Sequence, residues 1–438
     1  MSDIMKETLE HKQLAHLEAL QTAYDCLLTA QGFDGVLLYS GHPQRHFADD
    51  QHASFATYGH FMHWVPLQGL DHSWLLVRPG QMPKLQLHAP TDFWHLGTEL
   101  PEEAWVEAFA VERVATPTPP RLPAGRFAVL GDVDAETARN LGAELNPPAL
   151  TQALDEGRVR KSAYEIDCLR EANRRAGLGH RAARDAFFDG GAELDIQLAY
   201  LGASRQRESD LPYQSIVGVN QHAAVLHYQH YELAAAADHH SLLIDAGHRH
   251  RGYSADITRT WAGGDASDAF AGLIEGVTTI QQDLIRAMGP GVEYSTLHAQ
   301  MHQGLGALLG DLGMIHCSTT AAVEQGITRA FCPHGLGHLL GLQVHDVAGR
   351  QTADGTALPP PAEHPALRLT RTLEAGMVVT MEPGCYVIPM LLDPLRETPT
   401  GSDIDWAAVE ALAPHGGVRI EDNVLVTDQG AENLTPVI

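Results

Sequence analysis

The stretch Ser241–Trp261, SLLIDAGHRHRGYSADITRTW, joins an apolar run that ends in an aspartate to a second run of alternating polar residues. We expect two strands around the turn His248–Gly252, paired as a hairpin. Asp245 ends the apolar strand, where a bare carboxylate is costly unless it is paired or bound to metal. Either aspartate alone could equally cap a turn. Together, Asp245 and Asp256 predict a shared metal site at one end of the hairpin.

A histidine-rich segment follows at Phe331–Asp346, FCPHGLGHLLGLQVHD. Its glycines disfavour a regular helix and allow close approach of the backbone to its neighbours. The segment lacks HExxH, which argues against a thermolysin-like zinc protease. One imidazole can bind a metal while the others donate to substrate or shuttle protons. The three candidates are His334, His338 and His345.

Two later strands each carry a glutamate. Met377–Tyr386, MVVTMEPGCY, places Glu382 at the end of an apolar strand, before a turn. Gly416–Thr427, GGVRIEDNVLVT, puts Arg419 and Glu421 two residues apart on one strand face. On the surface this pair would be unremarkable. Buried beside a metal-bound carboxylate, the guanidinium would orient the carboxylate or stabilise a transition state.

Four carboxylates and one imidazole make a hard, oxygen-rich ligand set. Such a set suits two divalent cations, which can share a hydroxide and polarise a carbonyl at the same time. The composition therefore indicates hydrolysis without a protein nucleophile. Two Mn²⁺ ions are expected, because one imidazole among carboxylates suits a hard ion; Co²⁺ and Zn²⁺ remain alternatives. The predicted ligands are Asp245, Asp256, His338, Glu382 and Glu421.

The length of 438 residues predicts two domains, which we place at residues 1–157 and 158–438. Before this boundary, strands alternate with helices, which is typical of an α/β domain. The expected strands are Gly35–Tyr39, Ser73–Val77 and Arg126–Leu130, and the expected helices are 6–32, Glu102–Phe109 and Ala135–Leu145. Beyond the boundary, hairpins with glycine turns are separated by helices at 156–188, 266–288 and 295–312, with irregular loops at Ala353–Pro365 and Leu392–Asp405.

The formal net charge of −26 disfavours nucleic acid and anionic membrane as partners, because both need basic patches. The first residues are polar and charged, without the apolar region of a signal peptide, and no apolar run is long enough to span a membrane. Five cysteines at wide spacings form neither a zinc pattern nor an evident disulfide framework. These features together favour a cytoplasmic enzyme.

Taken in order, IDAG, SADITRT, PHGLGH, MEPG and RIEDN resemble the motifs of the pita-bread metallopeptidases. The chain looks most like the bacterial Xaa-Pro dipeptidase (prolidase) branch. The resemblance implies a creatinase-like N-terminal α/β domain followed by a C-terminal pita-bread domain of α+β class. It also implies a homodimer, for which the segment Gly41–Asp50 is our candidate to help close the partner's site.

Roles for the ligands follow from the matched motifs. Asp245 would bind one metal, while Asp256 and Glu421 would bridge both. His338 and Glu382 would complete the second metal, and Glu382 would also serve as the base for the shared water.

Further roles follow from the same resemblance. The histidines that contact substrate or stabilise the tetrahedral intermediate would be His227, His334 and His345. Arg419 matches the arginine beside the bridging glutamate, and Tyr213 matches a tyrosine that lines the substrate pocket. Arg368, 14 residues before Glu382, matches the arginine that binds the substrate carboxylate.

The implied activity is cleavage of Xaa-Pro dipeptides to free proline, through attack of the shared hydroxide on the scissile carbonyl. An aminopeptidase P would carry the same ligands but accept longer peptides. A methionine aminopeptidase usually lacks a comparable N-terminal domain. Creatinase-like hydrolases and non-enzymatic pita-bread binding proteins have an eroded ligand set. A side activity on organophosphate triesters is a further implication of the resemblance.

Overall fold

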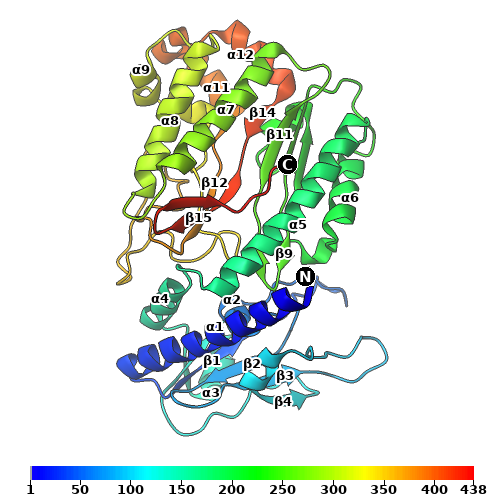
Figure 1. Ribbon diagram of the computed structural model, residues 1–438, viewed down its shortest axis with the longest axis vertical. Helices are drawn as coiled ribbons and strands as arrows, with labels where there is room; N and C mark the ends of the chain where they lie inside the picture. Colours follow the sequence, from blue (N-terminus) through cyan, green and yellow to red (C-terminus); the bar gives the residue numbers. More distant parts are fainter. Residues whose placement is uncertain (1) are drawn as a thin grey trace. The chain divides into compact units, whose positions relative to one another are not determined.

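The computed structural model describes residues 2–438, and for residues 2–8 the backbone alone (Figure 1). The chain forms two compact units. One ends at Cys168 and takes in Ala353–Gly355, and the other comprises Leu169–Thr352 and Thr356–Ile438. The second unit thus begins inside a long helix, and the predicted boundary after residue 157 remains a proposal.

A six-stranded mixed sheet forms the first unit. Its central strand pairs antiparallel with one neighbour and parallel with the other. The order is β4 (Ala110–Val114), β3 (Lys84–His88), β2 (Trp74–Val77), β1 (Gly35–Tyr39), β5 (Phe127–Leu130) and β6 (Ala143–Leu145). All three predicted strands are confirmed within one residue at each end.

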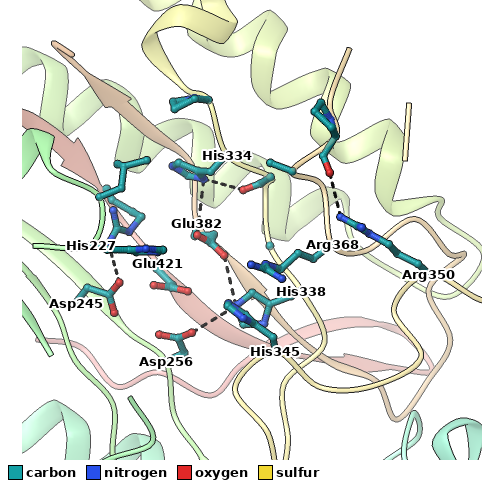
Figure 2. A pocket seen from close by; sticks show the side chains of 17 residues that line it. His227, Asp245, Asp256, His334, His338, His345, Arg350, Arg368, Glu382 and Glu421 are labelled. Atoms are coloured by element: carbon teal, nitrogen blue, oxygen red, sulfur yellow. Dashed lines mark hydrogen bonds and ion pairs between the residues drawn. The ribbon is translucent and has the colours of Figure 1, made fainter. Parts of the chain in front are cut away.

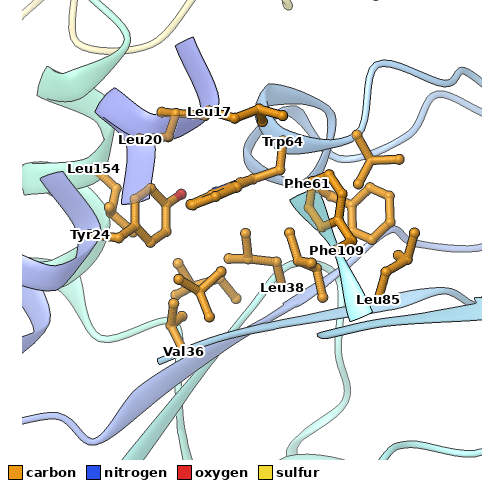
Figure 3. Packing of buried hydrophobic residues seen from close by; sticks show 14 of the residues in the cluster. Leu17, Leu20, Tyr24, Val36, Leu38, Phe61, Trp64, Leu85, Phe109 and Leu154 are labelled. Atoms are coloured by element: carbon orange, nitrogen blue, oxygen red, sulfur yellow. The ribbon is translucent and has the colours of Figure 1, made fainter. Parts of the chain in front are cut away.

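Strand β1 is buried along its whole length because helices cover both faces of the sheet. Val36 and Leu38 pack in a core with residues of α1 (Ser2–Gln31), α2 (Gly59–Trp64) and α4 (Pro148–Gly157) (Figure 3). The rings of Tyr24 and Trp64 meet edge to face in this core, with centroids 5.1 Å apart. The alternate residues of β1 pack on the opposite face, together with Ala138 of α3 (Ala135–Leu141). Such two-sided burial explains the unbroken apolar sequence GVLLY.

Two predicted helices of this unit were wrong in type or length. Glu102–Phe109 contains only the 3-10 helix η1 (Ala104–Ala108), which buries Trp105. The helix expected over Ala135–Leu145 ends at Leu141, because Gly142 takes a left-handed conformation with φ 67° and caps it. The next residues form β6 instead.

The predicted hairpin is present in the second unit. Strands β7 (Ile216–Val219), β8 (Ser241–Asp245) and β11 (Thr258–Ala262) form an antiparallel sheet in the order β11-β8-β7. The register pairs Thr258 with Asp245. The tip of the hairpin continues as β9 (Arg249–His250) and β10 (Tyr253–Ser254). Arg251 and Gly252, at φ 50° and 90°, make a tight turn between them.

Two further strand groups hold the glutamates. In one, β12 (Val378–Met381) pairs with β15 (Asp422–Thr427), which pairs with β16 (Gly430–Asn433). In the other, β13 (Gly384–Tyr386) pairs with β14 (Gly417–Arg419). The chain passes between the groups at residues 382–383 and again at 420–421. Each glutamate therefore lies at a break between two strands.

Helices cover these sheets. Phe187 of α5 (Ala163–Phe188) and Tyr200 of α6 (Glu193–Ser204) pack on buried residues of β7 and β8. Helices α7 (Asp268–Ala287) and α8 (Tyr294–Asp311) lie side by side (Figure 1). They confirm the helices predicted at 266–288 and 295–312. The predicted long helical stretch at 156–188 comprises the end of α4 and all of α5.

Shorter helices complete the second unit: α9 (Thr319–Glu324), α10 (Ile327–Phe331), α11 (Pro389–Leu392) and α12 (Trp406–Leu412). The loop expected at Leu392–Asp405 instead contains the 3-10 helices η4 (Asp393–Glu397) and η5 (Pro399–Asp403). Within residues 2–438, none of the helices has the length and apolarity that a membrane crossing requires.

Candidate active site

One cavity of about 640 Å³ gathers the predicted ligands in the second unit (Figure 2). All five line it, although 176 positions separate the first from the last in sequence. His227, His334, His345, Arg368 and Arg419 line it as well. Tyr213 is absent from the lining and lies behind the aspartates.

The hairpin positions the two aspartates. Asp245 is the last residue of β8, and Asp256 comes two residues before β11. The hydroxyl of Tyr213 lies 2.7 Å from Asp245 Oδ1 and 2.5 Å from Asp256 Oδ1. The side-chain oxygen of Asn423 accepts a hydrogen bond from the backbone N–H of Asp256 at 2.9 Å. Tyr213 therefore contacts the ligands themselves, a position suited to orienting carboxylates.

Arg419 connects the aspartate side of the cavity to the histidine side. Its Nη2 donates to Asp245 Oδ2 at 2.6 Å, and its Nη1 donates to the hydroxyl of Tyr386 at 2.9 Å. That hydroxyl lies 2.9 Å from Nε2 of His334. The guanidinium is 4% exposed, so this charge acts in a site largely withdrawn from water.

Thr258 contacts both Arg419 and Glu421. Its hydroxyl accepts a hydrogen bond from Nε of Arg419 at 3.1 Å and donates to Glu421 Oε2 at 2.6 Å. The backbone N–H of Glu421 donates to the carbonyl of Thr258 at 3.0 Å. Thr258 is fully buried. Thr258 thus contacts the side chains of both Arg419 and Glu421. This confirms that these two residues of the RIEDN motif share one strand face.

Replacing Thr258 with Val should lower metal affinity by about ten- to a hundredfold, the usual cost of losing a residue that orients a ligand. Thr260→Val is the matched control, because Thr260 is also buried but bonds only the backbone of Arg419. Metal titration of both stripped variants measures the difference. Equal affinities in the two variants would contradict the orienting role of Thr258.

The tautomer of His338 follows from its backbone contact. Its Nδ1 lies 2.9 Å from the carbonyl oxygen of Leu339, which can only accept, so Nδ1 carries the proton. Nε2 is left facing the site, 3.4 Å from Asp256 Oδ2 and 3.6 Å from Glu382 Oε1 (Figure 2). The hydroxyl of Thr380 donates to Glu382 Oε1 at 3.2 Å and accepts from the backbone N–H of His338.

Close backbone approach explains a glycine of the histidine segment. A Cβ added to Gly337 would lie 2.3 Å from the carbonyl oxygen of Thr380 and from the hydroxyl of Tyr294. Only glycine lets this segment lie against the end of β12. The bonds Thr380 N–H to His338 O and Glu382 N–H to Leu336 O, both 2.9 Å, are made across that contact.

The charge balance of the site fits divalent cations. Burial raises the pKa of Glu421 well above its usual range, and Asp256 and Glu382 act in the same direction. Burial also raises the pKa of Glu382 to about 7, with His338 opposing the shift. Ligand atoms of Asp256, His338 and Glu421 lie within 4.8 Å of one another. Four crowded carboxylates with Arg419 and one imidazole leave an excess of negative charge that bound cations would offset.

The other histidines of the cavity differ in whether their ring nitrogens already make hydrogen bonds. Burial lowers the pKa of His334 and of His345 to about 4, so both imidazoles are neutral at pH 7. Nδ1 of His334 lies 2.8 Å from the Gly335 carbonyl, and Nε2 faces Tyr386, so both its nitrogens are engaged. Within residues 2–438, no hydrogen bond occupies the imidazoles of His227 and His345. These two are the histidines open to a substrate.

Two further arginines, Arg350 and Arg368, line the cavity. Arg368 is exposed into the cavity, whereas the nearby Arg371 is buried and donates to Glu374 at 3.1 Å. Sequence reasoning missed Arg350, which donates to the carbonyls of Leu367 at 2.8 Å and Pro365 at 3.2 Å (Figure 2). It also missed Thr258, Thr380 and Tyr386. For Thr258 a signal existed, because it alternates with Asp256 in SADITRT.

Known proteins resemble this chain in sequence and in fold. The pattern of metallopeptidase family M24 matches residues 167–428, and that of the Xaa-Pro dipeptidase N-terminal domain matches residues 12–155. The chain is 48% identical to the Xaa-Pro dipeptidase of Marinobacter nauticus over 97% of both chains. It is 44% identical to that of Edwardsiella ictaluri over 98% of both.

Solved structures agree in architecture at lower identity. The aminopeptidase PepP of Pseudomonas aeruginosa superimposes with a TM-score of 0.74 at 21% identity, over 97% of this chain and 94% of that one. Escherichia coli aminopeptidase P with the inhibitor Pro-Leu gives 0.73 at 21% identity, over the same shares. These likenesses establish the fold, and the predicted two-domain architecture with a pita-bread domain is confirmed. With the family pattern covering more than half of its length, the chain belongs to metallopeptidase family M24.

Proposed function

We propose that the chain is a metal-dependent Xaa-Pro dipeptidase that uses two divalent cations, Mn²⁺ in preference to Co²⁺ or Zn²⁺. The observation that carries this proposal is the convergence of all five ligand side chains on one cavity that also exposes an arginine. The residues that would hold the cations are Asp245, Asp256, His338, Glu382 and Glu421. The intact set argues against an inert binding protein, and the relatives at 44–48% identity carry the name Xaa-Pro dipeptidase.

Bound cations supply Lewis-acid polarisation of the scissile carbonyl and activation of water. The protein supplies the proton transfers. We assign the role of base to Glu382, whose carboxylate lines the cavity, lies 3.6 Å from Nε2 of His338 and accepts from the hydroxyl of Thr380. We assign donation to the substrate to His227 and His345, which line the cavity and whose imidazoles make no hydrogen bond to the described part of the chain. Arg419 holds Asp245 directly, and His334 contacts the hydroxyl of Tyr386, which accepts from Arg419.

We assign recognition of the substrate carboxylate to Arg368. A dipeptide ends one residue beyond the scissile bond, so a cation at that distance selects for a free chain end. A guanidinium can hold a carboxylate through two parallel hydrogen bonds. The exposed position of Arg368 in the cavity supports this role, whereas the bonded Arg371 serves the loop.

Arg368→Ala should raise the KM for Xaa-Pro dipeptides by about ten- to a hundredfold, the equivalent of one charge-assisted hydrogen bond. A dipeptide amidated at its C-terminus lacks the partner charge, so its KM should change far less. Steady-state kinetics on both substrates and both enzymes measure this. Equal losses on acid and amide would show that Arg368 does not recognise the carboxylate.

Aminopeptidase P activity is the second candidate, because two solved structures with the same fold, at 21% identity, are named aminopeptidases. An Xaa-Pro tripeptide decides between the two activities. A dipeptidase should cleave the dipeptide in strong preference, and an aminopeptidase P should cleave both. We further propose a cytoplasmic homodimer in which Gly41–Asp50 approaches the partner's site. Organophosphate hydrolysis stays a prediction of the resemblance.

A further inference from the structure

Two buried imidazoles and one partly exposed imidazole form a second cluster away from the carboxylates. His298 and His302 lie four residues apart in α8, so both point from one helix face. His364 reaches them from the loop that follows the prolines at 359–361. The ring centroids lie 4.4 to 4.8 Å apart in the three pairs. One nitrogen from each ring lies within 4.8 Å of the other two.

Three nitrogens of His298 and His302 lack hydrogen-bond partners among the described residues. His298 is 2% exposed, and among residues 2–438 neither its Nδ1 nor its Nε2 has one. His302 is 1% exposed and bonds Thr328 through Nδ1 at 3.1 Å, which leaves Nε2 without a partner. A buried polar atom without a partner costs about 1–3 kcal/mol, so such atoms usually face an ion or a water.

The rings are in the protonation state that a metal requires. Burial lowers the pKa of His302 to about 3, and burial lowers the pKa of His298 and His364 as well. All three imidazoles are therefore neutral near pH 7, with lone pairs available. A set made only of neutral imidazole nitrogens suits zinc and other borderline ions, whereas Mn²⁺ prefers oxygen.

We propose that His298, His302 and His364 form a third metal site per chain, selective for a borderline divalent ion such as Zn²⁺. With three nitrogen ligands, water would complete a tetrahedral ion. The site differs from the catalytic one in its ligands and in the ion that it prefers.

The position of His364 beside the catalytic cavity indicates what a bound ion would do. His364 immediately precedes Pro365 and Ala366, which line the catalytic cavity, and lies four residues before Arg368. Arg350 already holds this segment through the carbonyls of Pro365 and Leu367. An ion between His364 and α8 would add a second tie. The bound zinc would therefore fix the wall of the cavity on which the substrate carboxylate is recognised.

The test uses the manganese-loaded enzyme exposed to Zn²⁺ and then freed of excess metal. Elemental analysis counts manganese and zinc together per chain, so that zinc displacing manganese leaves the sum unchanged. Wild type should hold one more ion than His364→Asn. His316→Asn is the control, because that imidazole is 60% exposed and outside the cluster. Equal sums in wild type and His364→Asn would overturn the proposal.

Two further measurements locate the ion and keep all three histidines intact. Anomalous diffraction at the zinc edge should place zinc between the rings, also in Asp256→Ala, whose catalytic ligands are incomplete. Failure of the dipeptidase proposal would thus leave this result standing. Arg329 lies near enough to lower the pKa of His302 and His364, and its positive charge opposes a cation. Arg329→Gln should therefore tighten zinc binding severalfold, and an unchanged affinity would contradict the site.

Discussion

Asp256→Ala should abolish both metal retention and nearly all turnover. Asp256 is 6% exposed, its Oδ2 lies 3.4 Å from His338 Nε2, and its Oδ1 accepts from Tyr213. Its loss therefore removes a carboxylate that contacts the other predicted ligands. We expect turnover to fall by more than about a thousandfold, since removal of a single electrostatic donor already costs about a hundred- to a thousandfold. Metal content per chain and kcat on an Xaa-Pro dipeptide measure the two effects.

Asp422→Asn is the matched control for this prediction. Asp422 is equally buried at 6% exposed and follows Glu421, but its carboxylate pairs with Arg259 at 2.6 Å. This variant should lose stability and keep its catalytic metals. Full activity in Asp256→Ala with one ion or none would rule out a mechanism that needs both cations.

Arg419→Met should destabilise the metal-free protein by about 3–5 kcal/mol, the usual cost of breaking a buried ion pair from one side. The change leaves Asp245 without its charged partner and removes the donor to Tyr386. Turnover should also fall, because the position of Asp245 depends on that bond. Urea unfolding of the stripped enzyme, and its kinetics after metal is restored, provide the measurements.

Two comparisons separate this effect from the general cost of losing a buried arginine. Arg371→Met removes a guanidinium that is also 4% exposed but bonds a loop, so it should spare kcat. Adding Asp245→Asn to Arg419→Met should recover most of the lost stability, because the unpaired charge disappears. If the double variant is no more stable than the single one, Asp245 is not what Arg419 stabilises.

The five carboxylate and imidazole residues predicted as ligands, all of which line the cavity, could be selected from the sequence, because each stands in a motif whose local pattern requires an explanation. Asp245 and Glu382 follow apolar strands, and the glycines around His338 signal close packing. The hairpin was predictable for the same reason, since its two strands and its turn lie within the 22 residues Ser241–Ala262. In the first unit, short apolar runs of sequence predicted the positions of β1, β2 and β5.

What the sequence did not reveal depends on contacts between distant segments. Thr258 and Tyr386 matter only because Arg419 folds against both, and no local pattern records that. Arg350 supports a loop whose partner carbonyls lie 15 and 17 residues away. His298, His302 and His364 looked like three of 26 histidines until α8 and the loop came together. The helix errors at 102–109 and 135–145 arose where a 3-10 turn and a glycine cap ended helices early.

The pairing of Glu421 with Thr258 also sets an order of events during synthesis of the chain. Residues reach solution from the N-terminal side, so Asp245 and Asp256 emerge long before their partner glutamate. The backbone bond between Glu421 and Thr258 spans 163 residues and cannot form until both are free of the ribosome. A nascent chain therefore holds an incomplete ligand set until translation has passed residue 421. If these residues bind the cations as proposed, metal loading is a late step that follows synthesis of the chain.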